Sequence, residues 1–212
     1  APAYLGFGGG SSSPNDEGWD SEVNNASNAD LQRYGVFLAN RYTQRNIIWI
    51  LGGDYNPPNP SKQWNIASGI RSVDPKALIT GHGSRNTESY TIWNGQTGWN
   101  LNNIYVDLDG ISQPASATAY ARSGPIPFFL IEGAYSGAQP DAACRLQVYQ
   151  SILSGACGHC FGTFPIWGFG EPHANGGIGP ATALLTSLDT PATRQMTYVR
   201  GLFLSYPWWK LV

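Results

Sequence analysis

The sequence contains few charged residues. Its 212 residues include 12 Lys and Arg and 14 Asp and Glu, which gives a net charge of −2 and a charged fraction of 12%. An average soluble domain has about 25% charged residues. A nucleic-acid-binding domain needs a basic surface, so this composition excludes that class. With 13% aromatic residues, including 8 Trp and 11 Tyr, the chain is better suited to an uncharged polar ligand such as a sugar.

Two further scarcities, of cysteine and of long apolar runs, and an abundance of glycine and proline narrow the structural class. Only 3 cysteines in a chain of this length exclude a disulfide scaffold. No apolar run approaches the ~20 residues of a membrane span, so we expect no membrane partner. The chain has 26 Gly and 15 Pro, too many for a long helical bundle. The aromatic content also excludes a disordered chain. A turn-rich globular protein remains.

Apolar runs alternate with helical patterns along the chain. The first residues indicate the end of a strand, and further strands are predicted at 46–51, 77–80, 104–108, 127–131 and 157–164. Several of these runs lack polar alternation, as in parallel strands buried on both faces. Helices are predicted at 27–42, with Ser27 as its cap, at 61–73, after Pro114, at 141–154 and from Pro191 onward.

This alternation predicts parallel βα units in one domain, residues 1–212. We expect a (β/α)8 TIM-barrel type of fold that is incomplete, because about six units are present and a full barrel takes ~250 residues. An incomplete barrel has an open edge. We therefore expect a missing N-terminal segment, a second chain or self-association to cover that edge.

Polar residues gather where the predicted strands end. In a barrel, the carboxyl ends of the strands form the face that carries the chemistry. The residues at these exits are Asp54, His82, Asp109, Glu132 and Trp167. Nucleotide-binding glycine motifs are lacking, which disfavours the alternative of an open, doubly wound sheet with a nucleotide.

Two of these residues are carboxylates that directly follow strongly apolar runs. Asp54 follows the run 46–51 and Glu132 follows the run 127–131. Glycoside hydrolysis needs two carboxyl groups flanking the scissile bond. In surroundings with little charge, one of them keeps its proton more easily than the other. Asp54 and Glu132 are therefore the candidate catalytic pair, although either could instead cap a helix or pair with an arginine.

Several longer motifs resemble those of the apiosidase-like glycoside hydrolases, family 140 and its relatives. The matching segments cover nearly the whole chain: Arg33-Tyr34-Gly35, Asn40-Arg41-Tyr42, Asn46-Ile-Ile-Trp-Ile-Leu-Gly-Gly-Asp54, Phe129-Leu-Ile-Glu132-Gly-Ala-Tyr135, Ser154-Gly-Ala-Cys-Gly-His159 and Ile166-Trp167. The chain departs from the family pattern after residues 104–109, where Asp107-Leu-Asp-Gly110 stands.

The resemblance implies roles for single residues. Asp54 corresponds to the acid/base and Glu132 to the nucleophile, so hydrolysis would retain the anomeric configuration. Retaining pairs are separated by about 5–5.5 Å. The resemblance also implies that substrate contacts come from Tyr4, His82, Tyr135 and Trp167. We expect a plant- or microbial-type polysaccharide or oligosaccharide as substrate, no cofactor and no metal, and a secreted or periplasmic location.

Two other functions stay open. A carbohydrate-binding protein could use the same aromatic face without catalysis. The run Cys157-Gly-His-Cys160 is identical to a disulfide-isomerase motif, although that chemistry needs the first cysteine at a helix N-terminus and a strand is predicted here. Cys144 could instead form a disulfide with Cys157 or Cys160. A zinc site on the same residues lacks a fourth ligand at the usual spacing.

Overall fold

The computed structural model describes residues 3–4, 20–42, 46–122, 126–167 and 187–210. The chain forms two compact units, Ala1–Asn103 and Ile104–Val212. The described helices include none that is both long enough and apolar enough to cross a membrane.

The first unit is built on a three-stranded parallel sheet in the order β1-β2-β3. Its strands are β1 (Ala3–Tyr4), β2 (Ile48–Gly52) and β3 (Leu78–His82). Tyr4 lies opposite Ile50, and Gly52 lies opposite His82. All residues of β2 and β3 after the first are buried, as the unbroken apolar runs predicted. Strands β2 and β3 therefore end side by side at one edge of the sheet.

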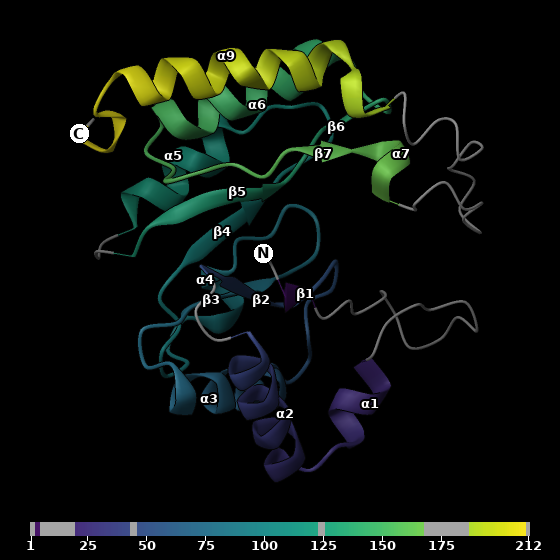
Figure 1. Cartoon of the computed structure of the whole chain (residues 1–212), viewed down its shortest axis with the longest axis vertical. Coiled ribbons are helices and arrows are strands. Elements are labelled where there is room, and N and C mark those ends of the chain that lie inside the picture. Colours follow the sequence, from purple (N-terminus) through teal and green to yellow (C-terminus); the bar gives the residue numbers. More distant parts are fainter. Residues whose placement is uncertain (1–2, 5–19, 43–45, 123–125, 168–186, 211–212) are drawn as a thin grey trace. The chain divides into compact units, whose positions relative to one another are not determined.

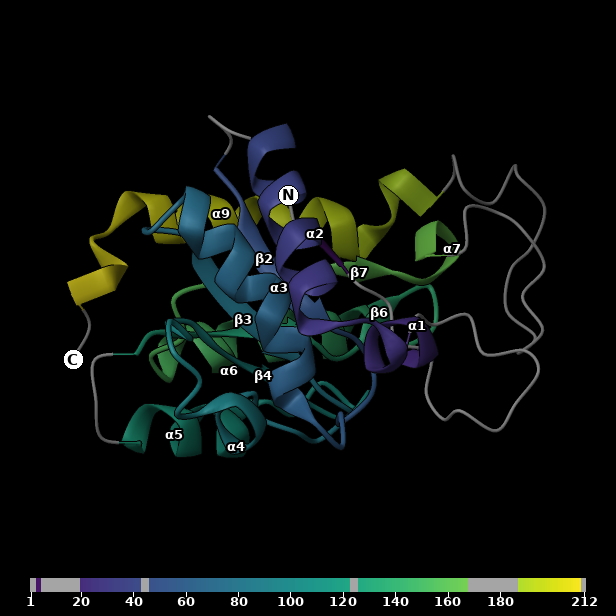
Figure 2. The same cartoon turned by 90° about the horizontal axis from the view of Figure 1, so that it is seen from below.

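Helices α2 (Asn28–Arg41) and α3 (Pro60–Val73) lie side by side against this sheet (Figures 1 and 2). The Ser27 hydroxyl accepts a 3.1 Å hydrogen bond from the Asp30 amide, which confirms the predicted cap of α2. Two shorter helices, α1 (Asp20–Asn25) and α4 (Tyr90–Trp93), complete the unit. Tyr34 of α2 is 40% exposed, and Tyr42, which follows the helix, is 43% exposed.

The contact between α2 and α3 is made by two glycines. A Cβ atom built on Gly35 would lie 3.0 Å from the Gly69 Cα, and one built on Gly69 would lie 3.0 Å from the Gly35 Cα. Each added Cβ would also lie only 2.1 Å from a backbone oxygen of the other helix. The close packing of these helices therefore depends on the absence of side chains at both positions.

In the second unit, β5 (Phe128–Glu132) pairs with β4 (Asn102–Tyr105), which begins at the unit boundary. Two short strands, β6 (Tyr135–Ser136) and β7 (Gly162–Thr163), pair in parallel. The core beside β4 and β5 contains Ile104, Val106, Phe128 and Leu130. The remaining elements are α5 (Gln113–Ala121), α6 (Asp141–Leu153), α7 (Phe164–Trp167), α9 (Pro191–Ser205) and the 3-10 turns Ser187–Asp189 and Trp208–Lys210.

Helices α6 and α9 pack side by side in the second unit (Figure 1). Val148 of α6 forms a buried cluster with Val199 and Phe203 of α9. The Thr190 hydroxyl accepts a 3.1 Å hydrogen bond from the Thr193 amide, so α9 begins where the sequence predicted. The start of α6 at Asp141 also matches the prediction. Gly155, just beyond its end, has a φ of +98°, as is common after a helix.

Two predicted strands differ from the structure. The strand expected at 104–108 lies at Asn102–Tyr105, so Asp107 and Asp109 fall in the turn beyond it. The strand expected at 157–164 is mostly irregular: His159 forms one bridge to Leu130, only Gly162–Thr163 is a strand, and residues 164–167 are helical. The described strands form three separate sheets rather than one closed ring.

The glycine contact between α2 and α3 leads to a stability prediction. Gly35→Ala forces the helices apart, so we expect the free energy of unfolding to fall by about 1–3 kcal/mol. Gly201→Ala is the matched control, since a Cβ on this exposed residue of α9 meets nothing within 4 Å. It should leave stability unchanged or raise it by up to about 1 kcal/mol. Urea denaturation of both variants measures the difference, and equal stabilities would contradict the packing argument.

Candidate functional site

In the first unit, the structure places three predicted site residues at neighbouring strand ends. Tyr4 is the last residue of β1, His82 is the last residue of β3, and Asp54 follows β2 by two residues. The register sets the end of β2 at Gly52 opposite His82, whereas Tyr4 lies opposite Ile50, two residues before that end. The side chain of Tyr4 lies outside the described part of the structure. The expected gathering of site residues at carboxyl ends is therefore found within this unit.

Asp54 is held in an unusual backbone conformation beside His82. Its φ is +52°, a value that few non-glycine residues adopt. The Asp54 amide donates a 3.1 Å hydrogen bond to His82 Nδ1, and one carboxylate oxygen lies 3.8 Å from the same nitrogen. An Nδ1 that accepts from an amide carries no proton, so the neutral ring has its proton on Nε2. The imidazole is buried, whereas the Asp54 side chain is 49% exposed.

A buried polar network supports the end of β3. The Asn103 amide group donates to the Thr80 hydroxyl at 2.7 Å and to the Gly81 carbonyl. The Ser89 hydroxyl donates to Asn102 Oδ1 at 2.9 Å. All four side chains of this network, Thr80, Ser89, Asn102 and Asn103, are buried. The network fixes the backbone immediately before His82.

In the second unit, Glu132 and Tyr135 form a hydrogen-bonded pair. Glu132 is the last residue of β5, and its Oε1 accepts a 2.6 Å hydrogen bond from the Tyr135 hydroxyl. A Cβ on Gly162 would lie 2.5 Å from the Tyr135 ring, so β7 passes directly beneath this ring. A hydroxyl that donates to a carboxylate stabilises the charged form and fixes its orientation.

Two other predicted site residues have different surroundings. Asp109 is exposed, and its Oδ1 accepts a 2.8 Å hydrogen bond from the Ile111 amide within the turn after β4. This bond is that of an Asx turn, which gives the residue a local structural role. Trp167 ends α7 rather than following a strand, and its side chain lies outside the described residues.

The Cys157–Cys160 motif lacks the surroundings of a redox site. Residues 157–160 run beside β5: the Cys157 amide donates to the Phe128 carbonyl and the Cys160 amide to that of Leu130, so Cys157 does not begin a helix. Burial raises the pKa of the Cys157 thiol, and burial together with the Glu132 carboxylate raises the pKa of Cys160. Reactive thiols need a lowered pKa. All three cysteines are free thiols, so no disulfide joins Cys144 to the other two.

Sequence reasoning missed Gln147 and gave His159 no role of its own. The Gln147 carboxamide bonds both backbone groups of Ala134, at 2.7 and 3.0 Å, and lies 3.2 Å from His159 Nε2. Burial lowers the pKa of His159 to about 4. A signal was present in α6, whose other buried residues, Ala143, Cys144, Val148 and Ser151, are small or apolar. An amide on such a face needs a specific partner.

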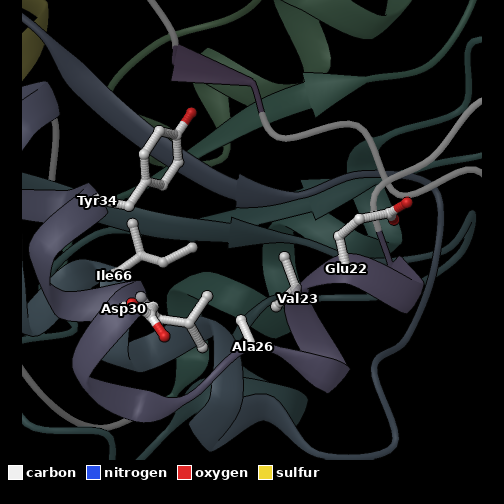
Figure 3. A pocket seen from close by; sticks show the side chains of 7 residues that line it. Glu22, Val23, Ala26, Asp30, Tyr34 and Ile66 are labelled. Carbon is white, nitrogen blue, oxygen red and sulfur yellow. The ribbon is translucent and has the colours of Figure 1, made fainter.

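A pocket of about 400 Å³ opens on the helical side of the first unit (Figure 3). Residues of α1, α2, α3 and the link between α1 and α2 line it: Glu22, Val23, Ala26, Asp30, Leu31, Tyr34 and Ile66. Neither Asp54 nor His82 is among these lining residues. The pocket is therefore distinct from the strand ends that carry the predicted acid.

Comparisons with known proteins found one matching family model and several similar solved structures. A family model described as "Apiosidase-like, catalytic domain" matches residues 4–210. A solved structure named "Glycoside hydrolase" is 24% identical, with a TM-score of 0.75 over 89% of this chain and 50% of its own. A glycoside hydrolase family 5 structure from Bacteroides vulgatus ATCC 8482 is 25% identical, with the same TM-score over 88% and 47%. The chain thus spans about half the length of these structures. A search of curated proteins found no match.

The buried histidine leads to a pH prediction. An unfolded histidine has a pKa of about 6.5, and the folded value for His159 is about 4. Between these values the unfolded chain binds the additional proton, so stability falls as pH drops from 6.5 to 4, by about 3 kcal/mol. We expect His159→Leu to have a flatter stability profile over this range than the parent. Urea denaturation at a series of pH values measures both slopes, and equal slopes would contradict the assignment.

Proposed function

Because the chain belongs to the apiosidase-like catalytic-domain family, we propose that it is a retaining glycoside hydrolase with Glu132 as nucleophile and Asp54 as acid/base. The observation that carries the proposal is the geometry of Glu132, a carboxylate at the end of a buried strand that accepts a 2.6 Å hydrogen bond from Tyr135. Hydrolysis by this route needs no metal or cofactor.

The surroundings of Glu132 suit a nucleophile. A nucleophilic carboxylate must be ionised and must approach the anomeric carbon along a fixed direction. The Tyr135 hydroxyl donates to Glu132, which favours the ionised form and limits rotation of the carboxylate. The Val106 amide donates to the Glu132 carbonyl at 3.0 Å, which anchors the backbone. Attack would form a glycosyl ester on Glu132 and expel the leaving oxygen.

The surroundings of Asp54 suit proton transfer. In the first step, the acid/base donates a proton to the leaving oxygen; in the second, the same group removes a proton from the attacking water. The half-exposed side chain of Asp54 can exchange its proton with solvent between the two steps. His82, which accepts from the Asp54 amide, supports the strained backbone at this position. We propose that His82 also contributes to binding of the sugar.

The parallel strands and their polar carboxyl ends support a (β/α)8 type of barrel, of which this chain supplies part. Its substrate would be a plant- or microbial-type polysaccharide or oligosaccharide, and its location outside the cytoplasm. Tyr4, Asp109, Tyr135 and Trp167 would contact the sugar. The edge of the partial barrel would be covered by a further segment, a second chain or self-association.

Isosteric variants test the two catalytic roles. Asp54→Asn and Glu132→Gln keep the side-chain shape but cannot carry out acid/base or nucleophilic chemistry, so we expect turnover to fall by about 10²–10⁴-fold. The matched control is Asp74→Asn, since Asp74 follows α3 and contacts the Lys76 amide. Release of reducing sugars from a glycan panel measures turnover. Full activity in either catalytic variant would refute its role.

A further inference from the structure

The carboxamide of Gln147 is fully engaged with one backbone position. Its Oε1 accepts a 2.7 Å hydrogen bond from the Ala134 amide, and its Nε2 donates to the Ala134 carbonyl at 3.0 Å. The second proton on Nε2 points to His159 Nε2 at 3.2 Å. Gln147 is 1% exposed, so water cannot replace these bonds without a large rearrangement. The side chain of α6 thus holds Ala134 at both of its polar groups.

The hydrogen bonds also settle which way the carboxamide points. The Ala134 amide can only donate and its carbonyl can only accept, so Oε1 must face the amide and Nε2 the carbonyl. His159 Nε2 must then act as acceptor, with the ring proton on Nδ1. This requires a neutral imidazole, in agreement with the burial that lowers the pKa of His159 to about 4. His159 can therefore accept from Gln147 throughout the neutral pH range.

The segment held by Gln147 is the turn that carries the Glu132–Tyr135 pair. A Cβ on Gly133 would lie 2.4 Å from Gln147 Oε1, so the carboxamide approaches the backbone directly after Glu132. On the other side of Ala134, the Tyr135 amide donates to Gln139 Oε1 at 2.8 Å. The residues between Glu132 and Tyr135 are thus fixed from α6, and a shift of Ala134 would change the 2.6 Å bond between the two side chains.

We propose that Gln147 is a positioning residue for the Glu132–Tyr135 pair and that His159 accepts the remaining amide proton of its carboxamide. The functional part of this inference rests on the proposed glycosidase activity, in which Glu132 is the nucleophile. Gln147 touches no reacting atom. Its contribution is to keep the nucleophile and its hydroxyl partner in one geometry, on which the rate of attack depends steeply.

The chain offers a matched control on the same helix. Gln150 lies one turn after Gln147 on α6, and its Oε1 also binds backbone amides, those of Ser112 and Gln113 at 2.9 and 3.1 Å. These amides belong to the start of α5 rather than to the Glu132 turn. Gln147→Met and Gln150→Met therefore remove comparable bonds, but only Gln147→Met releases the turn.

We expect Gln147→Met to lower kcat by about 10²-fold with little change in KM, since about 1 Å of misplacement costs that much, and to shift the NMR signals of Ala134 and of the Tyr135 ring. Gln150→Met should leave both unchanged. Gln147→Glu, which keeps the shape and loses the donor to Ala134, should resemble Gln147→Met and serves if the latter does not fold. Equal kcat values in the Gln147 and Gln150 variants would overturn the proposal, as would unmoved signals. If the parent hydrolyses nothing, the proposed function fails, and the NMR signals alone decide the positioning claim.

Discussion

A strand that is buried on both faces can place a charged side chain only where the strand ends. Strands β2, β3 and β5 are of this kind: apart from the exposed first residues of β2 and β3, they are buried up to their last residue. Burying a charged side chain without a partner in the interior of such a strand would cost several kcal/mol. The polar residues proposed to carry the chemistry, Asp54, His82 and Glu132, lie at such strand exits.

Each carboxylate is oriented through a neighbouring residue. Asp54 is placed through its own amide, which donates to a neutral histidine. Glu132 is placed through the hydroxyl of Tyr135 and through the turn that Gln147 holds. Neutral donors and acceptors orient a carboxylate while lowering its basicity less than an arginine would. Such partners would suit the proposed nucleophile, Glu132, and the proposed acid/base, Asp54.

Much of the fold could be predicted from periodicity and capping residues. The apolar runs before Asp54 and Glu132, and the cap residues Ser27 and Thr190, lie where the structure has them. Predictions failed where polar residues are buried or apolar residues are exposed. β4 starts at Asn102, whose side chain is satisfied by a network that hydropathy does not reveal. Trp209, an apolar residue in the last 3-10 turn, is 66% exposed.

The local sequence could not reveal contacts that depend on distant partners. The link between Gln147 and Ala134 joins residues 13 apart, and it is visible only once α6 lies against the turn. The segment 157–164 reads as a strand from its apolar residues, but Phe164 begins a helical turn that ends the extended conformation. Such outcomes are set by tertiary packing, which overrides local preference.

The stereochemistry of hydrolysis tests the central claim, that Glu132 is a nucleophile and Asp54 the acid/base, most directly. Proton NMR of the first sugar released from a substrate cleaved in the glycan panel shows its anomeric configuration before mutarotation. The account predicts the same configuration as in the substrate, because two displacements through a glycosyl ester on Glu132 restore it. Release of the inverted anomer would contradict the account, since it would mean a single displacement by water with no nucleophilic carboxylate.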